Sequence, residues 1–141
     1  MRLYDIAVAT LAIGAPRKWT DNLLSQHEVA DVVSVRQGVA RRLSYQALVR
    51  LAVIRQLHVH LGIGVANAVR FADRLLDSGQ GAVLDAGQVS LSVDLSAVRK
   101  AVDQRLSAAL ESAPSPRRGR PPRRAATGLT KVTATAPASR Q

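Results

Sequence analysis

Residues 38–62, GVARRLSYQALVRLAVIRQLHVHLG, decide the fold. In their second half, apolar side chains recur at the three- and four-residue spacing of a helix. They form one continuous stripe, which consists of Leu48, Leu51, Ile54 or Val53, Leu57 and Leu61. Ser44 is a residue type that caps the start of helices, and Gly62 marks the end of the pattern. The stretch therefore predicts a helix from Tyr45 to about Leu61.

The segment before this helix has the composition of a small β-hairpin. Val32–Arg36 and Val39–Leu43 are rich in β-prone residues and flank Gln37-Gly38, which is typical of a tight turn. Three arginines decorate the hairpin: Arg36, Arg41 and Arg42. The sequence therefore predicts a basic hairpin next to the long helix.

Two short helices are predicted further upstream. Residues 4–12 place apolar side chains near helical spacing, Gly14 breaks the pattern, and Pro16 suits the first turn of a second helix. This second helix runs to about Ser25. It buries one side, which consists of Trp19, Leu23 and Leu24, and Trp19 is expected to fill the core between the first helices. Its other side is polar and partly basic, and consists of Arg17, Lys18, Thr20, Asp21 and Asn22.

More helical and strand-like patterns follow the long helix. Residues 65–76 predict a fourth helix, and residues 82–95 alternate as a short hairpin does, with a turn at Ala86-Gly87. Residues 96–112 predict an amphipathic last helix. The apolar stripe of this helix needs a partner, which is either its own domain or a second copy of the chain.

Positive charge is concentrated in the last part of the chain. Residues 114–141 hold 7 basic residues and no acidic one, so they carry +7 of the formal net charge of +10. A segregated basic segment is the footprint of a nucleic-acid ligand, because each cation that neutralises a phosphate releases a counterion. The segment has one leucine and no phenylalanine or tryptophan, so it offers lipid no apolar face. Its composition predicts disorder in the free protein.

The predicted order of helix, turn, helix, basic hairpin and two helices resembles the DNA-binding domain of the MerR-like winged helix-turn-helix family. The matching residues are Gly14-Ala15-Pro16, Gly38, Arg41 or Arg42, Ser44, Leu48, Arg50-Leu51, Ile54-Arg55, Leu57 and Leu61-Gly62-Ile63. The resemblance covers about residues 3–78. It departs from the family at Thr20-Asp21, where those proteins carry an arginine-tyrosine pair, and in a wing that is a few residues longer. Residues 79–113 lack the family's long dimer helix and metal-sensing cysteines, so metal-triggered regulation is not implied.

A second resemblance lies in residues 116–124, PRRGRPPRR, which contain the Arg-Gly-Arg-Pro core of an AT-hook. Glycine lets the backbone lie deep in a narrow minor groove, and the following proline keeps the chain extended. The arginines that would reach along an A·T-rich floor or bind phosphates are Arg117, Arg118, Arg120, Arg123 and Arg124. Plain attraction to phosphates is the alternative to insertion.

These resemblances imply a fold that is mainly α with small β-hairpins. We expect a winged helix-turn-helix DNA-binding domain over residues 1–78, a β-hairpin and amphipathic helix over 79–113 as a candidate dimerisation element, and a basic tail over 114–141. The helix that starts at Pro16 would enter the major groove. There Arg17 and Lys18 approach guanine or phosphate, Asn22 pairs with adenine, and Thr20 contacts a phosphate or a thymine methyl. The hairpin arginines Arg36, Arg41 and Arg42 would hold an adjacent phosphate track or the minor groove. The alternative is that all of these side chains form an ordinary solvated face.

The sequence contains no recognisable catalytic or metal-binding pattern. The chain has no cysteine, which excludes disulfides and thiolate metal sites. His58 and His60, two residues apart on a helix, point about 200° apart and cannot share a metal ion. No phosphate loop, nucleophile elbow or carboxylate pair is present. We therefore expect no enzymatic activity and no metal, cofactor or small-molecule ligand.

The partner predicted from the sequence is double-stranded DNA, bound by a homodimer. The N-terminal apolar run is interrupted by Asp5 and is too short to span a bilayer, so we expect no membrane association and a cytoplasmic, nucleoid-associated location. The first functional hypothesis is a transcription regulator that reads a specific site. The alternatives are an architectural nucleoid or phage or recombination accessory protein with weak sequence preference, and an adaptor whose body binds another protein.

Overall fold

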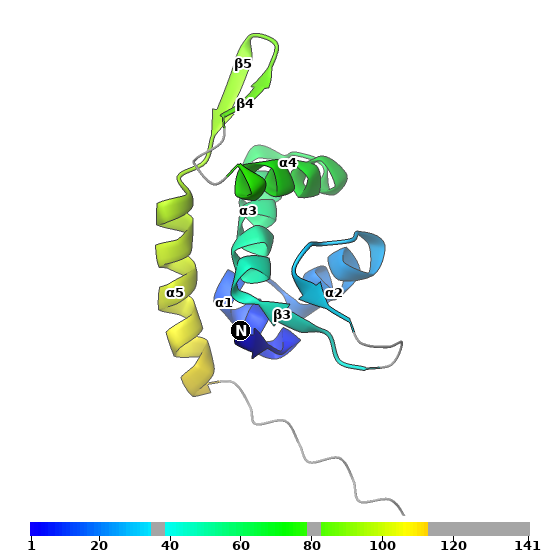
Figure 1. The fold of residues 1–141 in the computed structure, drawn as a ribbon, viewed down its shortest axis with the longest axis vertical. Coiled ribbons are helices and arrows are strands. Elements are labelled where there is room, and N and C mark those ends of the chain that lie inside the picture. Colours follow the sequence, from blue (N-terminus) through cyan, green and yellow to red (C-terminus); the bar gives the residue numbers. More distant parts are fainter. Residues whose placement is uncertain (35–38, 79–82, 113–141) are drawn as a thin grey trace, which may run out of the picture.

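The structure is a computed structural model that describes residues 1–34, 39–78 and 83–112. These ranges contain five helices and five short strands, which confirms a mainly helical fold (Figure 1). The elements are β1 (Leu3–Tyr4), α1 (Ile6–Ile13), α2 (Arg17–Gln26), β2 (Val32–Val33), β3 (Arg42–Ser44), α3 (Tyr45–Leu61), α4 (Val65–Asp77), β4 (Val83–Ala86), β5 (Val89–Ser92) and α5 (Leu95–Ser112). The Gln37-Gly38 turn, Arg36 and the whole basic tail lie outside the described residues.

Helix α3 is the centre of the molecule and has the bounds that the sequence predicts. Ser44 Oγ accepts a hydrogen bond from the backbone N–H of Ala47 at 3.2 Å, so the helix begins there. Gly62 ends it in the left-handed conformation, with φ +65°. Residues 47–54 are buried on every side of the helix, because α1, α4 and α5 all pack against it. Figure 1 shows α5 running beside α3 on the side away from α2.

One apolar core joins all five helices. Its buried members include Val8, Leu23, Leu51, Leu75 and Val102, one from each helix. The stripe predicted for the last helix is Val98, Val102, Leu106 with Leu95, Ala109 and Leu110. All of these residues of α5 pack in or against the core except Leu110, which is 41% exposed. Of the two partners considered for this stripe, the structure shows the chain's own body. The described part of residues 79–113 therefore shares its core with the segment before it.

Helices α1 and α2 meet at a tight turn. Asp5 Oδ1 accepts a hydrogen bond from the N–H of Val8 at 2.9 Å and starts α1. Gly14, with φ +65°, ends α1, and Pro16 caps α2 without a side-chain hydrogen bond. Both helices lie within one or two residues of their predicted bounds.

Three short strands form an antiparallel sheet in the order β1-β3-β2. Strand β3 takes the middle place, with Leu43 opposite both Tyr4 and Val32. Among the described residues, the pairing between β2 and β3 joins Val32 to Leu43 and Val33 to Arg42, and residues 39–41 of the second predicted strand are not in a strand. Strand β1 was not predicted, since two residues carry no period.

The second predicted hairpin is present and projects from the helical body (Figure 1). Ala86 pairs with Val89, so the two-residue loop is Gly87-Gln88, one position later than predicted. Gly87 has φ +68°, a conformation that favours glycine in tight hairpin loops. Across the ranges that the structure describes, the helices lack the combination of length and apolarity needed to cross a membrane.

Candidate nucleic-acid interface

The exposed side of α2 carries three of the predicted binding residues. Arg17, Lys18 and Asn22 are exposed, as the sequence analysis expects of a polar face. Arg17 Nε lies 3.7 Å from Asp21 Oδ2, one helical turn away, so part of its charge is balanced. Lys18 has no ion pair within the described residues. Lys18 is therefore the free cation of this helix face.

The prediction for Thr20 is wrong. Its side chain is fully buried, and its hydroxyl donates to the carbonyl oxygen of Pro16 at 3.4 Å. The reason is geometric: Thr20 lies three residues before the buried Leu23, so the two share the inward side of the helix. Thr20 contributes to packing and cannot contact a duplex.

Trp19 packs against the core, as predicted, and remains half-buried. The guanidinium carbon of Arg55 on α3 lies 5.5 Å from the centre of its ring. At this distance a cation is attracted to the face of the indole. Trp19 therefore links α2 to α3.

Arg41 connects the predicted wing to α2. Its Nη1 donates to Ser25 Oγ at 3.4 Å, and Ser25 Oγ in turn donates to the carbonyl oxygen of Asp21 at 2.7 Å. Lys18, Asn22 and Ser25 follow one another at spacings of four and three residues, so they form one stripe along α2. Arg41 thus lies at the end of the stripe that Lys18 begins. We call these four residues the α2–wing surface.

The remaining predicted residues are only partly brought together. Arg42 is exposed on β3 beside the buried Leu43, because successive residues of a strand point to opposite faces. No described contact joins Arg42 to α2. Arg36 and the tail residues Arg117, Arg118, Arg120, Arg123 and Arg124 lie outside the described residues.

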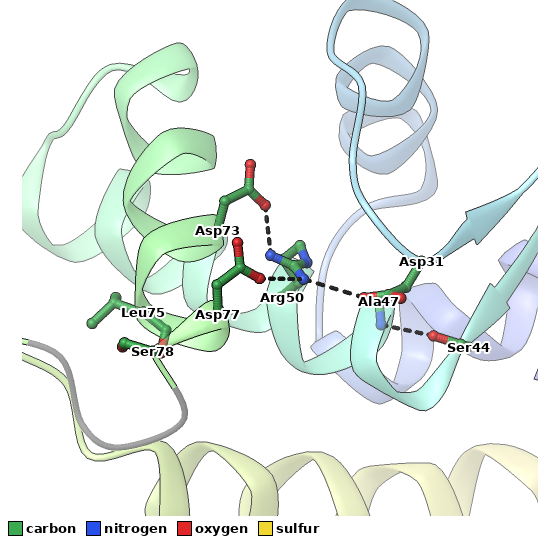
Figure 2. Close-up of polar contacts among 8 residues, drawn as sticks. All are labelled: Asp31, Ser44, Ala47, Arg50, Asp73, Leu75, Asp77 and Ser78. Carbon is green, nitrogen blue, oxygen red and sulfur yellow. Dashed lines mark hydrogen bonds and ion pairs between the residues drawn. The ribbon is translucent and has the colours of Figure 1, made fainter.

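Arg50 matches the MerR-like pattern in the sequence, but its burial and its partners were not predicted. The Arg50 side chain is 5% exposed and contacts three carboxylates: Nη1 lies 2.6 Å from Asp73 Oδ1, and Nη2 lies 3.2 Å from Asp31 Oδ2 and 3.7 Å from Asp77 Oδ1. Figure 2 shows the cluster between α3, α4 and the residue before β2. The sequence signal for this buried arginine was its position inside the apolar run 47–54. The positions of its carboxylate partners gave no such signal. The cluster anchors the start of the wing to the helical core.

Tyr45, at the start of α3, is linked to α5. Burial and a hydrogen bond to Asp103 raise the pKa of its phenol to about 12. His58 serves the other end of α3, where its Nδ1 lies 2.9 Å from the carbonyl oxygen of Ile63. His58 therefore has a structural contact at the end of α3. In the described ranges, His, Asp and Glu residues nowhere gather in a group of three that could hold a metal ion.

Comparison with family models, with curated proteins and with solved structures finds no match. The resemblance of residues 3–78 to the MerR-like family therefore stays a prediction. The function must be argued from the α2–wing surface and the charge of the chain.

Proposed function

We propose that this chain is a sequence-reading DNA-binding protein that acts as a transcription regulator. In this proposal α1 and α2 form a helix-turn-helix, α2 enters the major groove, and the segment between β2 and β3 is the wing. The observation that carries the proposal is the contact between Arg41 and Ser25. This contact holds Arg41 at the end of the exposed stripe that includes Lys18 and Asn22.

The chemistry of the α2–wing surface suits a duplex. Lys18 can bind guanine or a phosphate, and the amide of Asn22 can make two hydrogen bonds to adenine. Arg41 and Arg42 add positive charge that fixes the register on the phosphate backbone without reading bases. Thr20 has no part in this proposal.

The test is selection of bound fragments from a random DNA library with the full chain, followed by binding measurements on the selected site. We expect Lys18→Ala to weaken binding by roughly 5- to 100-fold, the usual value of a good base or phosphate contact. Asn22→Ala should relax the preference at one base position. Lys100→Ala is the matched control, because Lys100 is exposed on α5, on the other side of α3 (Figure 1). Equal losses for Lys18→Ala and Lys100→Ala would contradict the proposal.

The charge distribution favours an architectural protein as the second candidate, because the tail carries +7 of the net +10. Replacing Arg117, Arg118, Arg120, Arg123 and Arg124 by glutamine separates the two. A regulator keeps its sequence preference, and its salt dependence falls by roughly one unit of slope per lost phosphate contact. An architectural protein, or an adaptor, loses nucleic-acid binding altogether.

Homodimerisation through residues 79–113 remains part of the proposal, although the buried stripe of α5 no longer supports it. The surface that a second copy could still use includes the projecting β4–β5 hairpin, where Val89 is 69% exposed. Sedimentation of the free chain and of its complex with a selected site tests this part.

A further inference from the structure

Helices α3 and α5 enclose two adjoining hollows. The first, about 240 Å³, lies where α1 ends, and the second, about 430 Å³, lies toward β5. Both are lined by Gln56 and His60 of α3 and by Val98 and Ala101 of α5, so they are continuous. We call the whole depression the α3–α5 groove. Its volume is in the range of small-molecule sites.

One end of the groove is basic. Arg55 and Arg105 line the first hollow, and neither forms an ion pair with any residue that the structure describes. The contacts of Arg55 and Arg105 are the Trp19 ring and, at 3.5 Å, the carbonyl oxygen of Ile13. Two cations beside an apolar wall, without a carboxylate, favour an anion that would satisfy both.

The other end of the groove is apolar. Its lining there consists mainly of Leu57, Leu61, Leu91, Val93, Ala97, Val98 and Ala101. The one carboxylate in this lining belongs to Asp94, and its Oδ1 already accepts a hydrogen bond from the N–H of Ala97 at 3.0 Å. A negative charge at this end repels an anionic headgroup. The groove is therefore polarised, with cations at one end and an alkyl-sized apolar channel toward the other.

We infer that the α3–α5 groove binds a medium-chain fatty acid, with the carboxylate between Arg55 and Arg105 and the alkyl chain along Leu57 and Leu61. The sequence shows no motif for such a ligand because the groove exists only once α3 and α5 pack together. The inference does not depend on DNA binding, since no residue of the α2–wing surface lines the groove.

The experiment is a titration of the full chain with butanoate, hexanoate and octanoate, followed by calorimetry and by tryptophan fluorescence. Trp19 is the single tryptophan of the chain and contacts Arg55, so it reports on the basic end. We expect the affinity to rise about fourfold for each added methylene. Octan-1-ol, which has the chain without the charge, should bind at least tenfold more weakly than octanoate. Absence of octanoate binding, or equal binding of octan-1-ol, would overturn the inference.

Single substitutions test the two ends of the groove separately. Arg105→Gln should weaken octanoate binding about tenfold or more, by removal of a charged hydrogen bond. Leu61→Ser should flatten the dependence on chain length while leaving butanoate unaffected. Lys100→Gln is the matched control on α5, because Lys100 does not line the groove. Circular dichroism establishes that each variant is folded. If Lys100→Gln lost as much octanoate affinity as Arg105→Gln, octanoate would be attracted by the net charge of the chain only, and the proposed site would be refuted.

Discussion

Tyr45 makes the stability of the fold decrease at alkaline pH. The pKa of its phenol is raised from 10.0 to about 12 in the folded chain, so folding favours the protonated form. Its contribution is fully present below pH 10, falls as the unfolded chain ionises first, and is lost as the pH passes about 12. We expect the free-energy difference between the wild-type chain and Tyr45→Phe to shrink across this range. Urea denaturation at several pH values measures it, and a constant difference would contradict the raised pKa that burial and the hydrogen bond to Asp103 give Tyr45.

The Arg50 cluster predicts unequal effects of two similar substitutions. Asp73 is 36% exposed and 2.6 Å from Arg50, whereas Asp77 is 75% exposed and 3.7 Å away. Asp73→Asn weakens a short charged hydrogen bond to a buried guanidinium and should cost about 2 kcal/mol of unfolding free energy. Asp77→Asn, the matched control, should cost less than about 1 kcal/mol, as exposed pairs do. Urea denaturation measures both unfolding free energies. Equal losses for Asp73→Asn and Asp77→Asn would show that Arg50 responds to the total negative charge around it and not to the short hydrogen bond.

At the scale of elements, the ends of helices were the easiest features to predict. Ser44 and Gly62 act on the residues next to them, so the bounds of α3 follow from the local sequence. The partners Asp31, Asp73 and Asp77 of Arg50 lie 19, 23 and 27 residues away, and only tertiary packing brings them close. The prediction for Thr20 was wrong for a related reason. A hydroxyl that donates to the backbone carbonyl one turn earlier keeps a hydrogen-bond partner when it is buried, and polarity alone does not reveal this.

The two left-handed glycines at helix ends allow a matched comparison. Gly14 and Gly62 have the same φ of +65°, but a Cβ on Gly14 would lie 3.2 Å from Arg105 Nη1, whereas the space around Gly62 is open. Gly62→Ala should cost about 1 to 2 kcal/mol through backbone strain alone. Gly14→Ala should cost somewhat more, because Arg105 must move. Thermal denaturation of both variants, in the wild-type chain and in Arg105→Gln, measures the coupling between residues 14 and 105. The extra cost of Gly14→Ala over Gly62→Ala should vanish in the Arg105→Gln background.

At the scale of the whole molecule, α3 separates the two proposed sites. The α2–wing surface lies on one side of α3 and α5 on the other (Figure 1). Two described contacts join the groove to the α1–α2 segment. The Arg55 guanidinium lies over the Trp19 ring of α2, and Arg105 donates a hydrogen bond to the carbonyl oxygen of Ile13, where α1 ends and the turn to α2 begins. A carboxylate that binds Arg105 competes with this carbonyl oxygen. A ligand in the groove can therefore alter the turn that sets the angle of α2.

If both proposals are correct, octanoate and a selected DNA site must influence one another by the same factor. Thermodynamic linkage requires this reciprocity for binding free energies, and typical couplings amount to about 5- to 150-fold. We expect octanoate to weaken DNA binding, because it draws Arg105 away from the end of α1 and loosens the turn before α2. The measurement is the DNA dissociation constant with and without saturating octanoate, and the octanoate constant with and without DNA. Arg105→Gln should bring the factor by which octanoate weakens DNA binding closer to one, and the remainder is the part that passes through Arg55 and Trp19. If both sites bind their ligands but neither ligand affects the other, then neither the Arg105–Ile13 contact nor the Arg55–Trp19 contact couples the two sites.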